Sequence, residues 1–217
     1  MTEQDLKSLN QPGAPERLLD AAVALFTRKG YHATSVREIC ETAGVTKPVL
    51  YYHYRNKEGV FQAMMGLAVA AHREVLAQVR AADGSAADRI LLLCERVMAL
   101  VLEHPDIVRV IDSVYYGPRE GSPALDFESL YGEFDGFLSE LVQEGVRRGE
   151  FRGDDVEATH LALLGAFLIC KASLHINPAT AHGCHERPMG LGDLRRVIGT
   201  VLDGVRAARA GGKEEQR

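Results

Sequence analysis

The sequence predicts an all-α protein of about nine helices. Apolar residues recur at spacings of three and four along most of the 217 residues, as they do on one face of an amphipathic helix. No stretch alternates apolar and polar residues as a half-buried strand does, and no stretch repeats another. Glycine and proline fall mainly between the periodic stretches, where they end one helix and allow the next to begin.

The first two predicted helices have clear start and stop signals. Residues 15–29 are amphipathic, with proline in the first turn and glycine directly after the end. In the second helix Ser35 is followed three residues later by Glu38, which is the capping-box pattern. Gly44 stands where a left-handed residue closes such a helix. A short helix between residues 35 and 44 is therefore expected.

A third short helix follows without a linker. Thr46 is predicted to cap it, and Pro48 falls in its first turn, where a missing N–H costs nothing. Leu50 and Tyr54 are four residues apart and share its inner face. Polar and aromatic residues are left for the outside. Two short helices joined by a glycine turn in this way form a helix-turn-helix, the motif that places its second helix in a DNA groove.

Six further helices are predicted from the same periodicity. One of them is apolar on most sides and should be buried on most sides. Their ranges are 57–82, 86–103, 106–116, 123–148, 154–176 and 191–210. The domains that follow are a flexible arm (1–13), a helix-turn-helix domain (14–60), a larger helical domain (61–210) and a disordered tail (211–217).

Composition limits the class of protein. Hydrophobic residues make up 46% of the chain, yet no apolar run approaches the ~20 residues that cross a bilayer. The first residues hold no apolar signal segment, so a soluble, cytoplasmic protein is predicted. Four scattered cysteines predict reduced thiols and no disulfide framework. They are Cys40, Cys94, Cys170 and Cys184.

Positive charge is concentrated in the helix-turn-helix region. The whole chain has a net charge of −5, but residues 28–57 hold six basic and two acidic residues, a local charge of +4. A basic patch confined to one small domain is typical of phosphate contact. The basic residues are Arg28, Lys29, Arg37, Lys47, Arg55 and Lys57.

The same region resembles the DNA-binding domain of the TetR family of bacterial transcription regulators. The resemblance lies in the segments AGVTKP, LYYHY and NKEGVF and covers about residues 16–65. It implies a regulator of transcription, most simply a repressor, that binds a palindromic operator in double-stranded DNA as a homodimer. It also implies release by a small-molecule effector and dimerisation through residues 155–176 and 191–209. Neither enzyme activity nor a cofactor is predicted.

Ten residues are candidates for DNA contact. Lys47 could donate to guanine O6 and N7 or hold a phosphate, and both roles stay open at this point. Lys57 resembles the phosphate-contacting lysine of the family. The candidates are Thr34, Ser35, Arg37, Thr46, Lys47, Pro48, Tyr51, Tyr52, His53 and Lys57.

The larger domain holds more apolar residues than a simple core requires, which predicts a pocket for a largely apolar effector. Each of these residues could equally be plain core. The candidates are Met98, Leu102, His104, Ile111, Tyr115, Phe134, Phe137, Leu141, Leu164, Phe167, Leu168 and Lys171.

Three alternative functions compete with this prediction, and the simplest is a DNA-binding protein with no effector. A metal- or thiol-sensing regulator would use His182, Cys184 and His185, three possible zinc ligands, or the thiols of Cys94 and Cys170. A closed zinc site needs a fourth ligand, so no metal is predicted. A helical enzyme would need a catalytic motif, and the sequence has no His-Glu-x-x-His helix, nucleophile elbow or glycine-rich phosphate loop.

Overall fold

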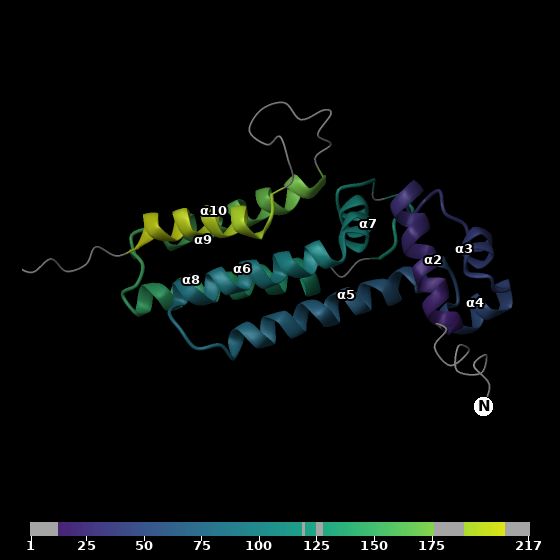
Figure 1. Ribbon diagram of the computed structural model, residues 1–217, viewed down its shortest axis with the longest axis horizontal. Helices are drawn as coiled ribbons and strands as arrows, with labels where there is room; N and C mark the ends of the chain where they lie inside the picture. The colour runs from purple at the N-terminus through teal and green to yellow at the C-terminus, as the bar shows by residue number, and fades with distance from the viewer. Residues whose placement is uncertain (1–12, 119, 125–127, 176–188, 207–217) are drawn as a thin grey trace, which may run out of the picture. The chain divides into compact units, whose positions relative to one another are not determined.

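The computed structural model describes residues 13–118, 120–124, 128–175 and 189–206 (Figure 1). Within these ranges the chain is α-helical, and the all-α prediction is confirmed. The only extended pairing in the described ranges is an isolated bridge between Phe151 and Arg206. The nine α-helices of these ranges are α2 (Ala14–Lys29), α3 (Val36–Ala43), α4 (Lys47–Tyr54), α5 (Lys57–Arg80), α6 (Ala86–Glu103), α7 (Pro105–Tyr115), α8 (Glu133–Arg147), α9 (Val156–Ala172) and α10 (Leu191–Val205).

Three predicted helices have different limits in the structure. The helix predicted at 123–148 begins only at Glu133, after a π-helical turn at Glu128–Gly132. A π-turn shifts the apolar spacing by only one residue, so periodicity does not reveal it. The helix predicted at 154–176 ends at Ala172 and continues as a 3₁₀ turn. The last helix, predicted to reach residue 210, ends at Val205, because Arg206 is extended and forms the bridge to Phe151.

The chain folds into two compact units. The first unit comprises the described residues of Met1–Ala70 and His104–Asp126, and the second comprises those of Ala71–Glu103 and Phe127–Arg217. The first unit therefore holds the predicted helix-turn-helix segment together with α7. Across the described residues, no helix has both the length and the apolar character needed to cross a membrane.

The first unit has an aromatic centre. The rings of Phe26, Tyr31 and Phe61 lie together, with centroids 5.2 to 6.2 Å apart. Leu18 and Ile39 are fully buried in the same unit. Burying each such apolar side chain is worth roughly 1.5–3 kcal/mol, so this core fixes α2, α3 and the start of α5 as one body.

The segment around α7 is attached to this body by polar contacts. The Thr27 hydroxyl donates to the carbonyl of Asp106, 3.3 Å away. Further along, the N–H of Ala124 donates to the Glu58 carboxylate at 3.1 Å, and the Gln62 side-chain amide donates to the carbonyl of Ala124. Two side chains one turn apart on α5 thus hold both backbone groups of a single residue.

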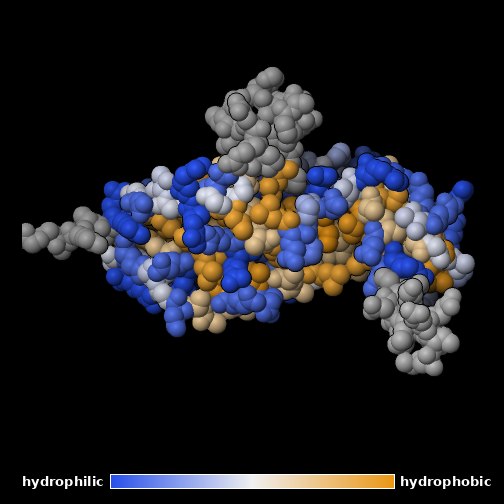
Figure 2. All heavy atoms as spheres, viewed as in Figure 1, coloured by the Kyte–Doolittle hydropathy of each residue, from blue (hydrophilic) through white to orange (hydrophobic). Residues whose placement is uncertain are grey.

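The second unit contains the end of α5 and helices α6, α8, α9 and α10. Its fully buried residues include Leu93, Leu138 and Leu163, and the tilted rings of Phe134 and Phe167 pack with centroids 4.6 Å apart. Figure 2 shows hydrophobic side chains, in orange, reaching the surface of this unit between hydrophilic ones. Some of its apolar surface is therefore not covered by the described chain.

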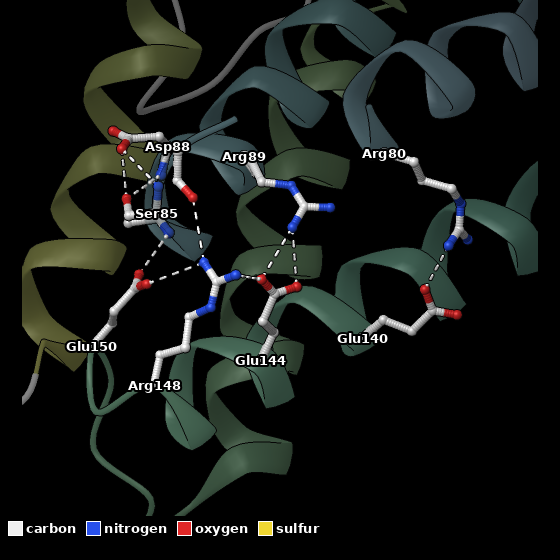
Figure 3. A network of polar contacts seen from close by, with 10 residues as sticks. Arg80, Ser85, Asp88, Arg89, Glu140, Glu144, Arg148 and Glu150 are labelled. Atoms are coloured by element: carbon white, nitrogen blue, oxygen red, sulfur yellow. Dashed lines mark hydrogen bonds and ion pairs between the residues drawn. The ribbon is translucent and has the colours of Figure 1, made fainter. Parts of the chain in front are cut away.

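Ion pairs connect α5 and α6 to α8 (Figure 3). Glu144 on α8 binds two guanidinium groups, that of Arg89 at 3.0 Å and that of Arg148 at 2.8 Å. Seen apart from them in Figure 3, Arg80 on α5 pairs with Glu140 at 2.8 Å. The Arg89–Glu144 pair is mostly shielded from solvent, whereas the Arg80–Glu140 pair is exposed. Loss of the shielded pair should therefore cost more stability than loss of the exposed one.

Candidate nucleic-acid interface

The start of α3 has the predicted capping box. The Ser35 hydroxyl accepts from the N–H of Glu38, and the Glu38 carboxylate accepts from the N–H of Ser35 at 3.0 Å. The Lys29 ammonium lies 2.5 Å from the same carboxylate. The hydrogen bond from Lys29, followed by those from Ser35, lowers the pKa of Glu38 from 4.5 to about 2. These contacts join the end of α2 to the start of α3.

This cap predicts a pH effect. Because the pKa of Glu38 is lowered in the folded state, its stabilisation is complete above about pH 4.5 and is lost as the pH falls toward 2. We expect the wild type to lose stability over this range more steeply than Glu38→Gln, as measured by circular dichroism in urea. Parallel pH profiles for the two proteins would contradict this role of Glu38.

The turn between α3 and α4 also follows the prediction in part. Gly44 is left-handed (φ 64°, ψ 39°), and its N–H bonds to carbonyls at the end of α3. Thr46 occupies the N-cap position of α4 with an extended backbone, but in the described structure its hydroxyl accepts no capping hydrogen bond. Thr46 is therefore the N-cap residue as predicted, but without the side-chain hydrogen bond of a capping threonine. Pro48 lies in the first turn of α4, where it needs no N–H partner.

Helix α4 packs with one face on the first unit. Leu50 is fully buried, and the Tyr54 hydroxyl donates to the carbonyl of Pro15 at 2.9 Å. Ala43, at the end of α3, is buried, and Val45 in the turn is half-buried. The outward residues are exposed as predicted, namely Thr46, Lys47, Pro48, Tyr51, Tyr52 and His53.

The junction between α4 and α5 is tight. Arg55 has a positive φ of 64°, which is rare for a residue other than glycine. Asn56 accepts the N–H of Gly59 through its side-chain oxygen at 2.7 Å. A Cβ atom added to Gly59 would lie 1.8 Å from the carbonyl oxygen of Tyr54. The orientation of α4 on the first unit thus depends on a glycine that no periodic pattern singled out.

Three of the six cations in this region are engaged within the protein. Lys29 pairs with Glu38, and Arg37 pairs with Glu41 at 2.7 Å. The Lys57 ammonium donates to the carbonyl of Tyr31 at 2.8 Å and lies 4.1 Å from the centre of its ring. Burial, and next the charge of Lys29, lowers the pKa of Lys57. Lys57 is therefore partly a structural residue of the α2–α3 turn.

The other three cations are Arg28, Lys47 and Arg55, which are exposed and form no ion pair with a described residue. They can neutralise phosphates without first breaking an internal contact. Arg28 and Arg55 contribute to the charge of the region but are not among the ten predicted candidates. A signal that could have selected Arg28 is the lack of a carboxylate three or four residues away, whereas Arg37 has Glu41 at that spacing. Arg55 has Glu58 three residues further on, so this signal would not have selected it.

Two candidates serve the fold of this region. Thr34 is buried, and its hydroxyl donates to the carbonyl of Gly30 at 2.8 Å. The hydroxyl of Ser35 is used in the capping box. Their contribution is to fix the α2–α3 turn.

The family sequence pattern described as bacterial regulatory proteins, tetR family, matches residues 18–64, which cover α3, α4 and the packed parts of α2 and α5. Residues 18–64 are a DNA-binding segment of the TetR family. The transcriptional repressor NicS of Pseudomonas putida is 24% identical over 155 residues, which is 70% of this chain and 72% of NicS.

The solved structure of the TetR-family regulator PfmR from Thermus thermophilus superposes with a TM-score of 0.66 at 22% identity, covering 86% of this chain and 97% of PfmR. AibR, solved with isovaleryl coenzyme A and operator DNA, superposes with a TM-score of 0.61 at 19% identity, covering 89% of this chain and 98% of AibR. These structures support the TetR fold, and the relatives are DNA-binding transcription regulators.

The candidate effector residues fall into two groups. Leu102, His104, Tyr115 and Leu168 are exposed, and Leu164 is half-buried. The rest are buried, and among them Lys171 donates to the Tyr131 hydroxyl at 3.1 Å. Ile111, His104 and Tyr115 belong to the first unit and the others to the second. The buried residues are Met98, Ile111, Phe134, Phe137, Leu141, Phe167 and Lys171.

The alternative of metal or thiol sensing rests on two sets of residues. His182, Cys184 and His185 lie outside the described residues. Among the described residues no group of three or more histidine, cysteine, aspartate or glutamate side chains could hold a metal ion. Cys94 and Cys170 are buried, and burial raises the pKa of both thiols. Because the thiolate is the reactive form, neither thiol is suited to rapid oxidation.

Proposed function

We propose that this chain is a ligand-responsive repressor that binds a palindromic operator as a homodimer and leaves it when a small molecule binds. The observation that carries the proposal is the exposed face of α4, which a capped turn holds in place. Beside it lie the cations Lys47 and Arg55, which pair with no carboxylate in the described ranges. Two such heads in a symmetric dimer would meet successive major grooves, so the operator should be a palindrome.

Selection from genomic DNA tests the proposal. Purified protein is mixed with fragments of the source genome at near-physiological salt, and the retained fragments are sequenced. We expect one enriched palindrome whose half-sites are centred about one helical turn apart. Retention of fragments without a shared sequence would contradict the proposal, since it would leave only the general attraction of cations for DNA.

Lys47 is expected to contact phosphate. It precedes the buried Leu50 by three residues, so its side chain starts on a flank of α4 and not on the outermost face. Lys47→Ala should weaken binding to operator and to unrelated DNA by a similar factor and reduce the salt slope of log K by about one unit. A loss of about 1–3 kcal/mol confined to the operator would instead assign a base contact. Equal binding by the wild type and the variant would contradict both roles.

An apolar stripe on α9 supports the homodimer. Leu161, Leu168 and Ile169 are exposed, and a Cβ atom added to Gly165 between them would meet nothing within 4 Å. A helix with leucine, isoleucine and glycine on its free face is suited to close packing against a second copy. Ala158, Ala162 and Ala172 extend the exposed stripe.

Leu161→Asp should convert the dimer to a monomer, because the carboxylate would have to be buried without a partner. Analytical ultracentrifugation at micromolar protein concentration measures whether the protein is a dimer or a monomer. Leu67→Asp is the matched control, since Leu67 is also an exposed leucine but lies on α5 in the first unit. If both variants sediment like the wild type, the dimer does not form through α9.

The effector is proposed to bind in the second unit. Its interior is rich in aromatic and aliphatic side chains, including the neighbouring rings of Phe134 and Phe167. AibR, which shares the fold, was solved with an acyl coenzyme A and operator DNA, and this supports an apolar or acyl effector for the present chain. An effector that releases DNA must bind the released conformation more tightly than the DNA-bound one.

A further inference from the structure

We propose that His72 on α5 is the polar anchor for the effector, and that it binds one uncharged oxygen, a carbonyl or a hydroxyl, on an otherwise apolar molecule. The inference rests on the proposed function, because it names the chemical class of the effector that the second unit would bind. His72 is not among the effector candidates predicted from the sequence.

His72 lies on the inner face of α5 within the second unit. It is 5% exposed, and Leu76 and Val79, four and seven residues later, are buried on the same face. On α5, which the structure describes from end to end, His72 is the only buried polar side chain. A buried polar group lowers stability unless it is hydrogen-bonded, so a histidine at this position needs a partner.

The Nε2 atom of His72 is buried and forms no hydrogen bond with a described residue. Three other buried side-chain atoms share this property, but each belongs to a side chain with an ion-pair partner. Nε2 of His160 lies 2.9 Å from Oδ1 of Asp135, and the guanidinium of Arg89 pairs with Glu144. Among the described residues, the imidazole of His72 is therefore the group best placed to bind a polar atom of a ligand.

The surroundings of His72 favour an uncharged ligand group over a carboxylate. Burial is the main cause that lowers the pKa of His72, while Glu133 raises it and Arg73 lowers it. The imidazole is therefore neutral at neutral pH. The Arg73 guanidinium binds the Glu133 carboxylate at 2.6 Å and the Ser129 hydroxyl at 3.2 Å. The cation next to His72 is thus already neutralised, and a ligand carboxylate there would be buried without a counter-charge.

A π-turn joins this part of α5 to the start of α8. The turn spans Glu128–Gly132, and turns of this kind are rare and often occur at functional sites. Its Ser129 accepts the hydrogen bond from Arg73. Its Tyr131 hydroxyl accepts from Lys171, whose ammonium lies 5.0 Å from the centre of the Tyr131 ring. Both cations beside the turn are engaged within the protein, which leaves the imidazole on α5 for a ligand.

Competition between four eight-carbon probes tests the inference. Wild type and His72→Leu are loaded with Nile red, a neutral apolar dye, and titrated with octane, methyl hexyl ketone, octanol and octanoate. The ratio of the affinities for ketone and octane should fall about tenfold in His72→Leu, because leucine leaves the ligand oxygen buried without a partner. Octanol should behave like the ketone, and octanoate should bind more weakly than either to the wild type.

The same variant has an expected result without any probe. Leucine replaces a buried nitrogen that has no described partner with apolar atoms, so His72→Leu should unfold about 2–4 °C above the wild type. Circular dichroism measures the midpoint. A lower midpoint would mean that the nitrogen already has a structural partner, and would overturn the inference.

Nitrogen NMR of wild-type protein with labelled histidine gives a readout that does not depend on a variant's stability. The ketone should shift the Nε2 resonance of His72, which is identified by its absence from His72→Leu, and octane should leave it in place. A resonance that none of the oxygen-bearing probes shifts would contradict the anchor.

His104→Leu is the matched control, since His104 is an exposed histidine of the first unit. It should keep the wild-type preference among the probes. The inference alone is overturned if the ketone preference is equal in wild type and His72→Leu, if octanoate binds best, or if no probe displaces the dye, while an operator is still selected from genomic DNA. Selection without an enriched sequence would overturn the proposed function instead, whatever the probes do.

Discussion

Gly59→Ala is expected to weaken specific DNA binding more than any other change of a single glycine in the first unit. The new Cβ atom would lie 1.8 Å from the carbonyl oxygen of Tyr54, and backbone cannot move aside as a flexible side chain can. Either α4 shifts on the first unit or the unit is destabilised, at a cost of about 1–3 kcal/mol. Because about 1.4 kcal/mol corresponds to a factor of ten, operator affinity should fall roughly tenfold or more. Fluorescence anisotropy with labelled operator measures the loss.

Gly66→Ala is the control on the same helix. Nothing lies within 4 Å of a Cβ atom added there, and the position is exposed. Alanine is a better helix former than glycine, so this variant should bind DNA normally and gain up to about 1 kcal/mol of stability. If the two alanine variants behave alike, contact with the Tyr54 carbonyl does not set the position of α4.

Glu144→Ala should cause the largest loss of stability among the charged residues of the second unit. Only 22% of the Glu144 side chain and 14% of the Arg89 side chain are exposed, and the carboxylate accepts from Arg89 through both oxygens. Removing it leaves Arg89 as a shielded cation without its carboxylate partner. The free energy of unfolding should fall by about 2–3 kcal/mol, as measured in urea by circular dichroism.

Glu140→Ala is the matched change on the same helix. Its partner Arg80 is 52% exposed and Glu140 itself 60% exposed, so the pair is screened by water and should contribute about 0–1 kcal/mol. Figure 3 shows that Glu140 and Glu144 both extend from α8 toward their arginine partners. Equal losses from the two variants would mean that shielding from solvent does not separate them.

Local rules in the sequence predicted much of the first unit. The capping box needs residues only three positions apart, and the left-handed turn needs only a glycine, so Ser35, Glu38 and Gly44 could be assigned directly. The inner face of α4 follows from the spacing of Leu50 and Tyr54. Each of these features is decided by neighbours along the chain, which a single sequence contains.

Features that depend on distant partners could not be predicted. The ammonium of Lys57 donates to the carbonyl of Tyr31, which lies 26 residues earlier in the sequence. A lysine that the sequence assigned to phosphate contact therefore also makes a hydrogen bond within the protein. Arg55 has a positive φ, although its residue type gives no sign of it. The π-turn before α8 keeps an apolar pattern close to that of a helix. Spacing alone contains no information on these three points.

The two hydrogen bonds that hold Ala124 have a consequence for how this protein can evolve. Glu58 and Gln62 recognise only the N–H and the carbonyl of that residue, and its exposed side chain takes no part. Almost any amino acid except proline could stand at position 124 without loss of the attachment. Position 124 can therefore drift in sequence, and the selective constraint falls on the two residues of α5 that hold it.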